Sequence, residues 1–311
     1  MVELLLQYGV DYESPEFHQW RPLHIASQAG HVDVVDLLIE SGSCVNAVAD
    51  DNTTPLYLGA YSGHKGVAER LLTSNAEVNA QTTDGWTALH ACAQRGYTEL
   101  ASVVLDAGFD KRIVSKNGDT ALHSAARFGH AKVVQLFIQH NFDLNAVNLA
   151  GHTALRIASR FDHRDITRLL IDAGAKTDTK DPDGDGNLHV AARHAGREVV
   201  RMLLESGLAV DEVSGGGWTA LLCAAAEGNH EVMSVLLEGG ANVDVTTPSG
   251  DNALLLAVRR NCLEAVKVLV KNKANLNMLD SKGFTALRIS LVKQFEEISE
   301  FLLKNGADTN L

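Results

Sequence analysis

One sequence pattern returns along this chain every 33 residues. Residues 84–97 read Asp-Gly-Trp-Thr-Ala-Leu-His-Ala-Cys-Ala-Gln-Arg-Gly-Tyr, and alignment on the threonine of this stretch gives nine equivalent positions without insertion or deletion. These positions are Arg21, Thr54, Thr87, Thr120, Thr153, Gly186, Thr219, Asn252 and Thr285. Repetition at a fixed period of about 20–50 residues indicates a stack of small units that bury their apolar faces against their neighbours.

Each unit carries the signals of two short helices. Threonine, asparagine or glycine precedes the first helix everywhere except at Arg21, and these residues satisfy the first backbone amides of a helix. Pro22 and Pro55 follow at the first helical position, where a missing amide costs nothing. The second helix ends at a glycine or asparagine that tolerates a left-handed conformation, with Lys273 as the exception. One helical turn before this glycine or asparagine stands a pair of apolar residues, such as Leu38 and Ile39. These pairs predict a core that continues from unit to unit.

A turn and two helices within 33 residues resemble the ankyrin repeat, whose Thr-Pro-Leu-His motif survives at 54–57, 87–90 and 120–123. The resemblance implies an all-α ankyrin-repeat solenoid of stacked helix-turn-helix units with β-hairpin or loop fingers. We expect a single domain over residues 1–311, with a partial repeat at 1–16 and repeats at 17–49, 50–82, 83–115, 116–148, 149–181, 182–214, 215–247, 248–280 and 281–311. Apolar residues at both ends of the array predict that the chain is an excerpt of a larger protein.

Composition and charge exclude several classes of function. The formal net charge of -12 disfavours nonspecific binding to nucleic acid or to an anionic membrane. The four cysteines lie in different repeats without a Cys-x-x-Cys pair, which argues against a disulfide framework or a zinc knuckle. No apolar run approaches the roughly 20 residues of a membrane-spanning helix. We therefore expect a monomeric protein of the cytoplasm or nucleus, without nucleic acid as a partner and without membrane insertion.

Thirteen histidines suggest a metal site, but eight of them hold two repeated positions. These residues are His24, His90, His123 and His189 in the motif, and His31, His64, His130 and His163 after the connection between the helices. Equivalent positions in neighbouring repeats lie about 8–10 Å apart, whereas zinc binds its ligands at about 2.0–2.3 Å. In ankyrin repeats the motif histidine bonds to nearby turn backbone, and we expect that role here.

The stretch Asp181, Asp183 and Asp185 resembles the opening of a calcium loop. An EF-hand requires a glutamate at its twelfth position, and the residue there is Ala192. The chain also lacks a phosphate-binding loop and the Gly-x-Ser-x-Gly motif of serine hydrolases. The sequence therefore predicts no catalytic residues, no metal and no cofactor.

Two repeat positions vary in ways that the fold does not require. The first follows the glycine of the finger turn and carries four large aromatic residues, Trp20, Trp86, Trp218 and Phe284, which include all three tryptophans of the chain. Exposed aromatic rings suit an interface. Alternatively, each ring packs on its own finger, and both interpretations stand.

The second variable position closes the first helix, which faces the inner surface in ankyrin repeats. Its candidate partner-binding residues are Tyr61, Gln94, Arg95, Arg127, Phe128, Arg160, Phe161, Arg193, His194, Arg259 and Arg260. Guanidinium groups beside aromatic rings suit an acidic or carboxylate-bearing peptide. The alternative is that these arginines pair with finger aspartates such as Asp84, Asp119, Asp162 and Asp183 of the same protein.

We therefore expect a non-catalytic protein-protein interaction scaffold that binds a partner along its concave face and finger tips. The alternative is a targeting or autoinhibitory segment of a larger enzyme or channel whose catalytic part lies outside this chain. The family resemblance also implies asparagine hydroxylation in the loop after the second helix. The positions are Asn46, Asn79, Asn145 and Asn277, with Asp211 and Asp244 at two others, and hydrogen bonding between loops is the other interpretation.

Overall fold

The computed structural model describes residues 19–309, in which eighteen helices form nine consecutive pairs. The chain divides into two compact units, residues 1–149 and 150–311, and each unit is described by itself. The all-α prediction is confirmed. The half-repeat predicted at 1–16 lies outside the described residues, and a single domain over the whole chain stays a prediction.

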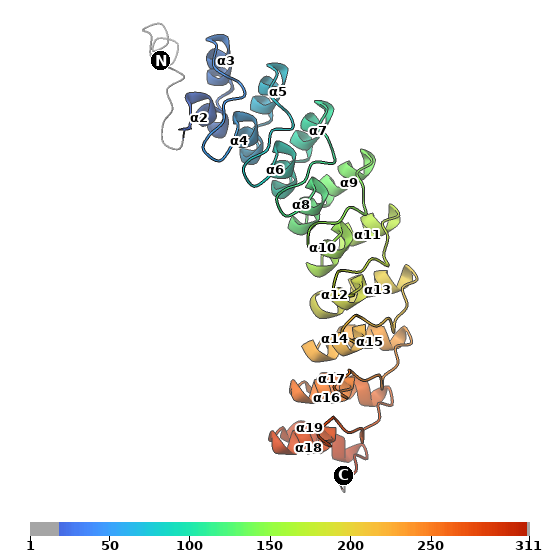
Figure 1. The fold of residues 1–311 in the computed structure, drawn as a ribbon. Helices are drawn as coiled ribbons and strands as arrows, with labels where there is room; N and C mark the ends of the chain where they lie inside the picture. Colours follow the sequence, from blue (N-terminus) through green and yellow to red (C-terminus); the bar gives the residue numbers. More distant parts are fainter. Residues whose placement is uncertain (1–18, 310–311) are drawn as a thin grey trace. The chain divides into compact units, whose positions relative to one another are not determined.

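Unit 1 contains four described helix pairs (Figure 1). They are α2 (Pro22–Ala29) with α3 (Val32–Glu40), α4 (Pro55–Ser62) with α5 (Lys65–Thr73), α6 (Ala88–Arg95) with α7 (Thr98–Asp106), and α8 (Ala121–Phe128) with α9 (Ala131–Gln139). Each first helix packs on the first helix of the next pair, and the second helices pack on one another in the same way.

Unit 2 contains five pairs with the same arrangement. They are α10 (Ala154–Arg160) with α11 (Arg164–Asp172), α12 (Asn187–His194) with α13 (Arg197–Glu205), α14 (Ala220–Glu227) with α15 (His230–Glu238), α16 (Ala253–Arg259) with α17 (Leu263–Lys271), and α18 (Ala286–Val292) with α19 (Glu296–Lys304).

The first helices begin where their capping residues predict. Side-chain oxygens of seven N-cap residues accept the amide three residues later: Thr54, Thr87, Thr120, Thr153, Thr219, Asn252 and Thr285. Arg21 and Gly186 supply no such oxygen. In those two repeats the backbone amide of the N-cap residue is the donor. It donates to Nδ1 of His24 and of His189, at 3.1 Å in both cases.

The second helices are followed by residues with positive φ, as predicted from their glycines and asparagines. These residues are Gly42, Asn75, Gly108, Asn141, Gly174, Gly207, Gly240, Lys273 and Gly306. Lys273 has a φ of 66°, a left-handed conformation that is costly for a residue with a Cβ atom. The predicted exception is thus held in the same backbone geometry as the glycines.

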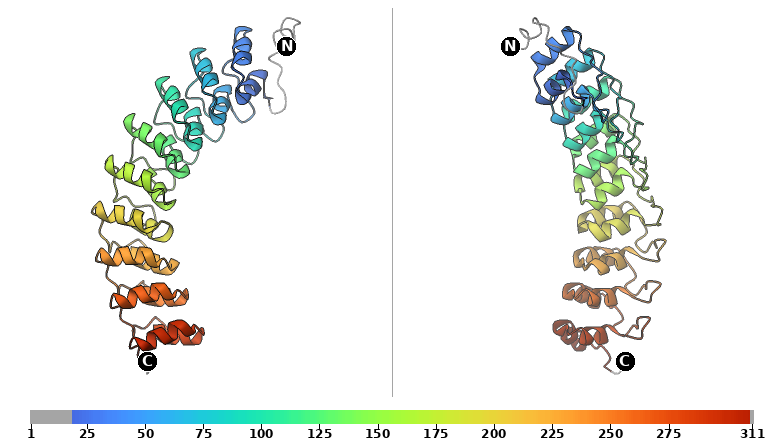
Figure 2. Two further views of the ribbon diagram at one scale, coloured as in Figure 1. Left: turned by 180° about the vertical axis from the view of Figure 1, so that it is seen from behind. Right: turned by 60° about the vertical axis from the view of Figure 1, so that its left-hand side comes forward.

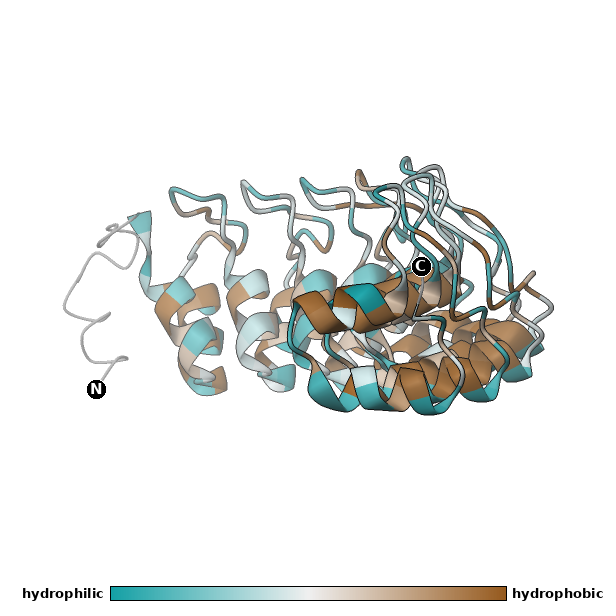
Figure 3. Ribbon diagram, turned by 90° about the horizontal axis from the view of Figure 1, so that it is seen from below, coloured by the Kyte–Doolittle hydropathy of each residue, from teal (hydrophilic) through white to brown (hydrophobic). Residues whose placement is uncertain are grey.

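Small residues let the first helices approach one another. Ala91, Ala93, Ala125 and Ala126 of unit 1 are fully buried, and close packing of this kind stabilises through apolar burial and dispersion. Figure 3 shows apolar residues along the helix surfaces that meet neighbouring helices and polar residues along the outer surfaces. The core of unit 2 is built in the same way, with larger side chains such as Leu203 at its centre.

The fingers between pairs are loops (Figure 2). Backbone hydrogen bonds join neighbouring fingers. In unit 1 three amides each donate to a carbonyl in the preceding finger: Thr83 to Asp51 at 2.7 Å, Lys116 to Asp84 at 2.8 Å, and Leu149 to Asn117 at 3.0 Å. In unit 2 the amide of Gly215 donates in the same way to the carbonyl of Asp183 at 3.1 Å, and isolated β-bridges form at Lys180 with Gly186 and at Thr246 with Asn252. In two other fingers of unit 2 the donor position is occupied by Pro182 and by Pro248, which have no N–H to donate.

Candidate partner-binding surfaces

The tryptophans of the finger turns lie against the first helix of their own repeat. The ring of Trp86 is centred 5.8 Å from the ring of His90, and Trp20 lies 6.2 Å from His24. Trp218 is half-buried against the core of unit 2. Each ring therefore has one face packed on its own repeat and part of its surface open to solvent.

The first-helix ends of unit 1 bring an arginine onto a stack of tyrosines. The guanidinium carbon of Arg95 lies 4.5 Å from the ring centre of Tyr61, and that ring stacks on Tyr57 at 6.1 Å. Burial raises the pKa of Tyr57 to about 12. Arg95 is exposed and forms no ion pair with any described residue, so its N–H groups remain open. The neighbouring Gln94 accepts a hydrogen bond at its backbone carbonyl from Nε2 of His130, at 2.9 Å.

Three other arginines of the predicted stripe pair with aspartates of their own repeat. In each case the aspartate follows the finger glycine and precedes the arginine by eight residues. The pairs are Arg127 with Asp119 at 3.3 Å, Arg193 with Asp185, and Arg259 with Asp251 at 2.9 Å. The predicted alternative therefore holds for these three, although Arg193 pairs with Asp185 and not with Asp183.

Two of these pairs also reach the next finger. Nδ2 of Asn148 donates to the carboxylate of Asp119 at 2.7 Å, and Arg259 pairs with Asp280 at 2.6 Å. Burial raises the pKa of Asp280, but amide hydrogen bonds, including one from Phe284, and the Arg259 guanidinium hold it below its ordinary value. These arginines connect successive repeats, and their charge is compensated within the protein.

Arg160 differs from its neighbours in the stripe. It is exposed, and among residues 19–309 it makes no hydrogen bond or ion pair. Partial burial and, to a smaller extent, the nearby charges of Arg160 and Arg193 lower the pKa of His194, while Glu227 acts in the opposite direction. Phe161 is exposed at the same helix end, as Phe128 is in unit 1.

The remaining predicted residues of unit 2 have surface partners. Arg260 pairs with Glu227 at 2.9 Å, and both side chains are about half exposed. Phe284 lies beneath the guanidinium of Arg288, whose carbon is 4.5 Å from the ring centre. Exposed pairs of this kind contribute little to stability.

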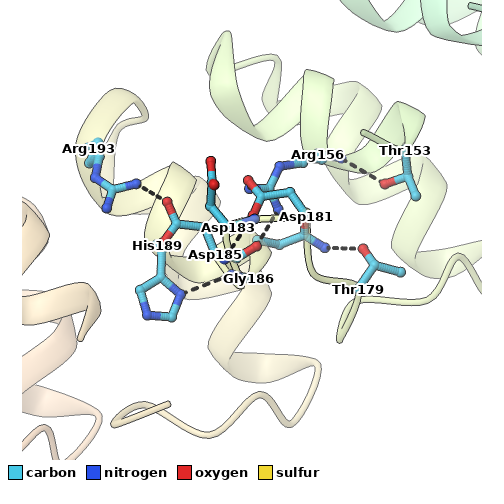
Figure 4. Close-up of polar contacts among 10 residues, drawn as sticks. Thr153, Arg156, Thr179, Asp181, Asp183, Asp185, Gly186, His189 and Arg193 are labelled. Atoms are coloured by element: carbon cyan, nitrogen blue, oxygen red, sulfur yellow. Dashed lines mark hydrogen bonds and ion pairs between the residues drawn. The ribbon is translucent and has the colours of Figure 1, made fainter. Parts of the chain in front are cut away.

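Two of the three aspartates of the calcium-like stretch, Asp181 and Asp185, have side-chain partners within the protein (Figure 4). Asp181 accepts the amides of Asp183 and Asp185 at 3.0 and 2.9 Å and pairs with the buried Arg156, while Asp185 pairs with Arg193. Within the described part of the chain, no group of three histidine, cysteine, aspartate or glutamate side chains could hold a metal ion. Turn geometry and arginine pairing account for this stretch.

Five of the eight histidines at the two repeated positions bond to backbone carbonyls. Their Nε2 atoms lie 2.9–3.2 Å from carbonyl oxygens: His24 from Ala47 and Thr53, His90 from Asp119, His189 from Trp218, His64 from Gln28, and His130 from Gln94. The structural role expected of these residues is confirmed.

Loop asparagines connect each repeat to the next. Asn46, Asn79 and Asn277 accept a backbone amide from the following loop at 2.7–2.9 Å, which supports the hydrogen-bonding interpretation. Arg112 occupies this position in repeat 83–115 and is not among the predicted site residues. Its signal in the sequence is that every other repeat has asparagine or aspartate there.

Comparison with known proteins identifies the family. The family described as "Ankyrin repeats (3 copies)" matches residues 1–82, 56–148, 89–181, 136–212, 175–247 and 221–311, which together run the full length. The chain belongs to the ankyrin repeat family. Among solved structures it is similar to the human ASB11 ankyrin repeat domain, with a TM-score of 0.63 and 27% sequence identity over 72% of this chain and 99% of that chain. No curated protein matches it.

Ankyrin repeats are generally protein-binding, non-catalytic modules, and here the repeats extend over the whole chain. No helix in the described part of this ankyrin repeat chain combines the length and apolar character needed to cross a bilayer. The identity of the partner and the compartment stay predictions.

Proposed function

We propose that the chain binds a carboxylate-rich, extended segment of a partner protein at the exposed ends of its first helices. In unit 1 the contact centres on Arg95 and Tyr61. In unit 2 it centres on Arg160 and His194, with Phe161 as the apolar neighbour. Each unit is proposed to carry its own contact.

The proposal rests on a difference among the arginines, of which some have aspartate partners and others have none. Arg127, Arg193 and Arg259 have aspartate partners within their own repeats, whereas Arg95 and Arg160 have none among the described residues. Free guanidinium groups stand out in a chain with a net charge of -12. A carboxylate can form two parallel hydrogen bonds with such a group.

The tyrosine beneath Arg95 favours binding of a carboxylate in a defined orientation. The cation–π contact with Tyr61, at 4.5 Å from the ring centre, restrains the Arg95 side chain. Less side-chain freedom is then lost when a ligand binds. This restraint distinguishes Arg95 from an ordinary mobile surface arginine.

The finger rings supply the apolar surroundings of these contacts in the proposal. Trp20 and Trp86 belong to unit 1, and Trp218 and Phe284 belong to unit 2. Their outer faces are partly open, and aromatic residues are enriched among the residues that dominate interface energies.

The proposal is tested by fluorescence anisotropy with a short labelled glutamate-rich peptide. Arg95→Gln is expected to weaken the contact of unit 1, and Arg160→Gln that of unit 2, each about tenfold, the effect of losing one charge-assisted contact, while the other contact keeps its affinity. The control is Arg168→Gln, which removes an exposed arginine of α11 that pairs with Glu205. Equal losses in all three variants would show nonspecific charge attraction and would contradict the proposal, as would unchanged affinity in the first two.

A further inference from the structure

The loops that follow α7 and α9 in unit 1 enclose a pocket of about 500 Å³. Its inner lining includes Phe109 and Phe142, which are 5% and 6% exposed. Val114 and Val147, which are 41% and 59% exposed, line its outer part. The pocket therefore offers an apolar surface that a ligand can reach from solvent.

The two phenylalanines are unusual for their repeat position. The equivalent residues elsewhere are Ser43, Ala76, Ala175, Leu208, Ala241, Ala274 and Ala307, which are mostly small. Phe109 and Phe142 stand in consecutive repeats, and both line the same pocket. An aromatic lining of this kind suits a bulky apolar side chain.

Arg112 removes a hydrogen bond that joins these loops elsewhere. The equivalent residues are Asn46, Asn79, Asn145, Asp178, Asp211, Asp244, Asn277 and Asn310. Five of them accept a backbone amide 31 residues later, at 2.7–3.1 Å: Asn46 from Glu77, Asn79 from Asp110, Asp211 from Asn242, Asp244 from Asn275, and Asn277 from Asp308. An arginine side chain has no acceptor atom, so Arg112 cannot make this bond.

The amide of Asp143, 31 residues after Arg112, is the corresponding donor. It makes no hydrogen bond with any described residue, and Asp143 lines the pocket together with Arg112. The pocket therefore contains an open backbone donor where five of the other loops have a filled one.

The cations at the pocket favour an anionic acceptor for this amide. Arg112 is 89% exposed and pairs with Asp110 at 3.0 Å, and a surface pair of this kind is weak enough for a ligand to compete. Lys111 donates to the carbonyl of His140 at 2.6 Å and retains two further N–H groups. Both cations line the same pocket as Asp143, whose own carboxylate accepts the Asn145 amide at 2.9 Å.

We propose that this pocket binds a bulky apolar side chain of a protein partner, whose adjacent acidic residue supplies the acceptor that Arg112 lacks. The apolar side chain contacts Phe109 and Phe142. The carboxylate accepts from the Asp143 amide and from the Arg112 guanidinium. This surface is built from loops after the second helices, so it is distinct from the first-helix ends of the proposed function.

The test is an NMR titration of the isotope-labelled full chain with a synthetic peptide that carries one phenylalanine followed by two aspartates. The Asp143 amide proton is expected to move downfield and saturate. Control peptides with alanine for phenylalanine, or lysines for the aspartates, are expected to bind at least about tenfold more weakly, the loss of one charge-assisted or one large apolar contact. Absence of saturable binding at millimolar peptide, or equal binding of the controls, overturns the proposal.

Two surface variants locate the peptide. Arg112→Asn restores the acceptor of the other repeats, so it is expected to move the Asp143 amide downfield without peptide and to weaken peptide binding about tenfold. Val147→Ser, at an exposed position, is also expected to weaken it. Arg95→Gln is expected to leave the peptide-induced shift of the Asp143 amide unchanged. Binding that depends on Arg95 and not on Arg112 assigns the peptide to the first-helix ends and overturns the pocket proposal.

Discussion

Arg259 forms an ion pair with Asp280, in the finger that leads to the next helix pair, at 2.6 Å from a carboxylate whose side chain is only 2% exposed. The same guanidinium pairs with Asp251 of its own finger at 2.9 Å. Because a carboxylate this deeply buried needs a compensating charge, the arginine contributes to the connection between repeats.

Loss of this arginine should destabilise unit 2. Arg259→Gln leaves the Asp280 carboxylate with only its amide partners, and we expect the free energy of unfolding to fall by about 2 kcal/mol. Urea denaturation followed by circular dichroism measures the change. The matched control is Arg260→Gln, whose exposed pair with Glu227 predicts a change below about 0.5 kcal/mol. An equal loss in the free energy of unfolding in both variants would show that the buried pair stabilises no more than the exposed one, and would contradict the prediction.

The buried arginine of α10 should be more sensitive still. Arg156 donates to the carbonyl of Asp185 at 2.7 Å and pairs with Asp181. Arg156→Met should cost about 3 kcal/mol because it leaves a buried carboxylate unpaired. Adding Asp181→Asn should recover part of this loss, since the amide carries no charge. Denaturation of the single and double variants measures the coupling, and strictly additive effects would argue against the pair.

The exposed Arg160, on the same helix as Arg156, is the control for that series. Arg160→Met should change the free energy of unfolding by less than about 0.5 kcal/mol, as is usual for surface positions.

Protonation of a buried histidine should make unit 1 sensitive to acid. Burial lowers the pKa of His90 from 6.5 to about 4, while its ring lies 2.8 Å from the Thr87 hydroxyl and 3.0 Å from the Asp119 carbonyl. The unfolded chain binds a proton below pH 6.5 and the folded one only below about 4. The stabilisation from neutral His90 is therefore complete above this range and is lost as pH falls through it.

A His90→Gln variant isolates this contribution. Between pH 7 and pH 5 the unmodified protein should lose about 2 kcal/mol more of its free energy of unfolding than the variant does. Urea titrations at the two pH values provide the comparison. The same pH dependence in both proteins would show that His90 is not responsible.

The lysine with positive φ offers a stabilising change. Lys273→Gly should raise the free energy of unfolding by about 1 kcal/mol, because glycine adopts a φ of 66° without steric cost. Asn75→Gly, at the equivalent position with a φ of 65°, should give a smaller gain because asparagine tolerates this conformation. Thermal melts measure both, and a loss of stability at Lys273 would contradict the argument.

The fold could be predicted because each repeat carries the same capping and helix-ending residues at the same spacing. Thr87 begins a helix by capping it and Gly96 ends one with a φ of 80°, and the same residue types recur at the same spacing. Local capping and close packing of small residues act within one repeat or between neighbours, so no long-range information is needed.

The candidate site could be predicted only in part. The sequence indicates that Arg127 and Arg193 share a repeat position with Arg160, and it suggests aspartate partners. It does not show that the partner of Arg193 is Asp185 and not Asp183, because that depends on which side chain of the finger turns toward the helix end. A spacing of eight residues between aspartate and arginine was a usable signal.

The pocket beside Arg112 shows a second limit. The departure from asparagine or aspartate is visible in the sequence, but its consequence depends on a partner amide 31 residues away. Only the structure shows that the Asp143 amide lacks an acceptor and that two phenylalanines line the space beside it.

The central claim is that paired arginines stabilise the repeats while unpaired arginines bind the partner. Measuring both the free energy of unfolding and the affinity for the glutamate-rich peptide in Arg95→Gln and Arg259→Gln tests it most directly. We predict that Arg95→Gln weakens binding about tenfold and leaves stability within about 0.5 kcal/mol, whereas Arg259→Gln lowers stability by about 2 kcal/mol and leaves affinity unchanged. A folded Arg259→Gln protein that loses affinity as Arg95→Gln does, or an Arg95→Gln protein that binds normally, would contradict the claim.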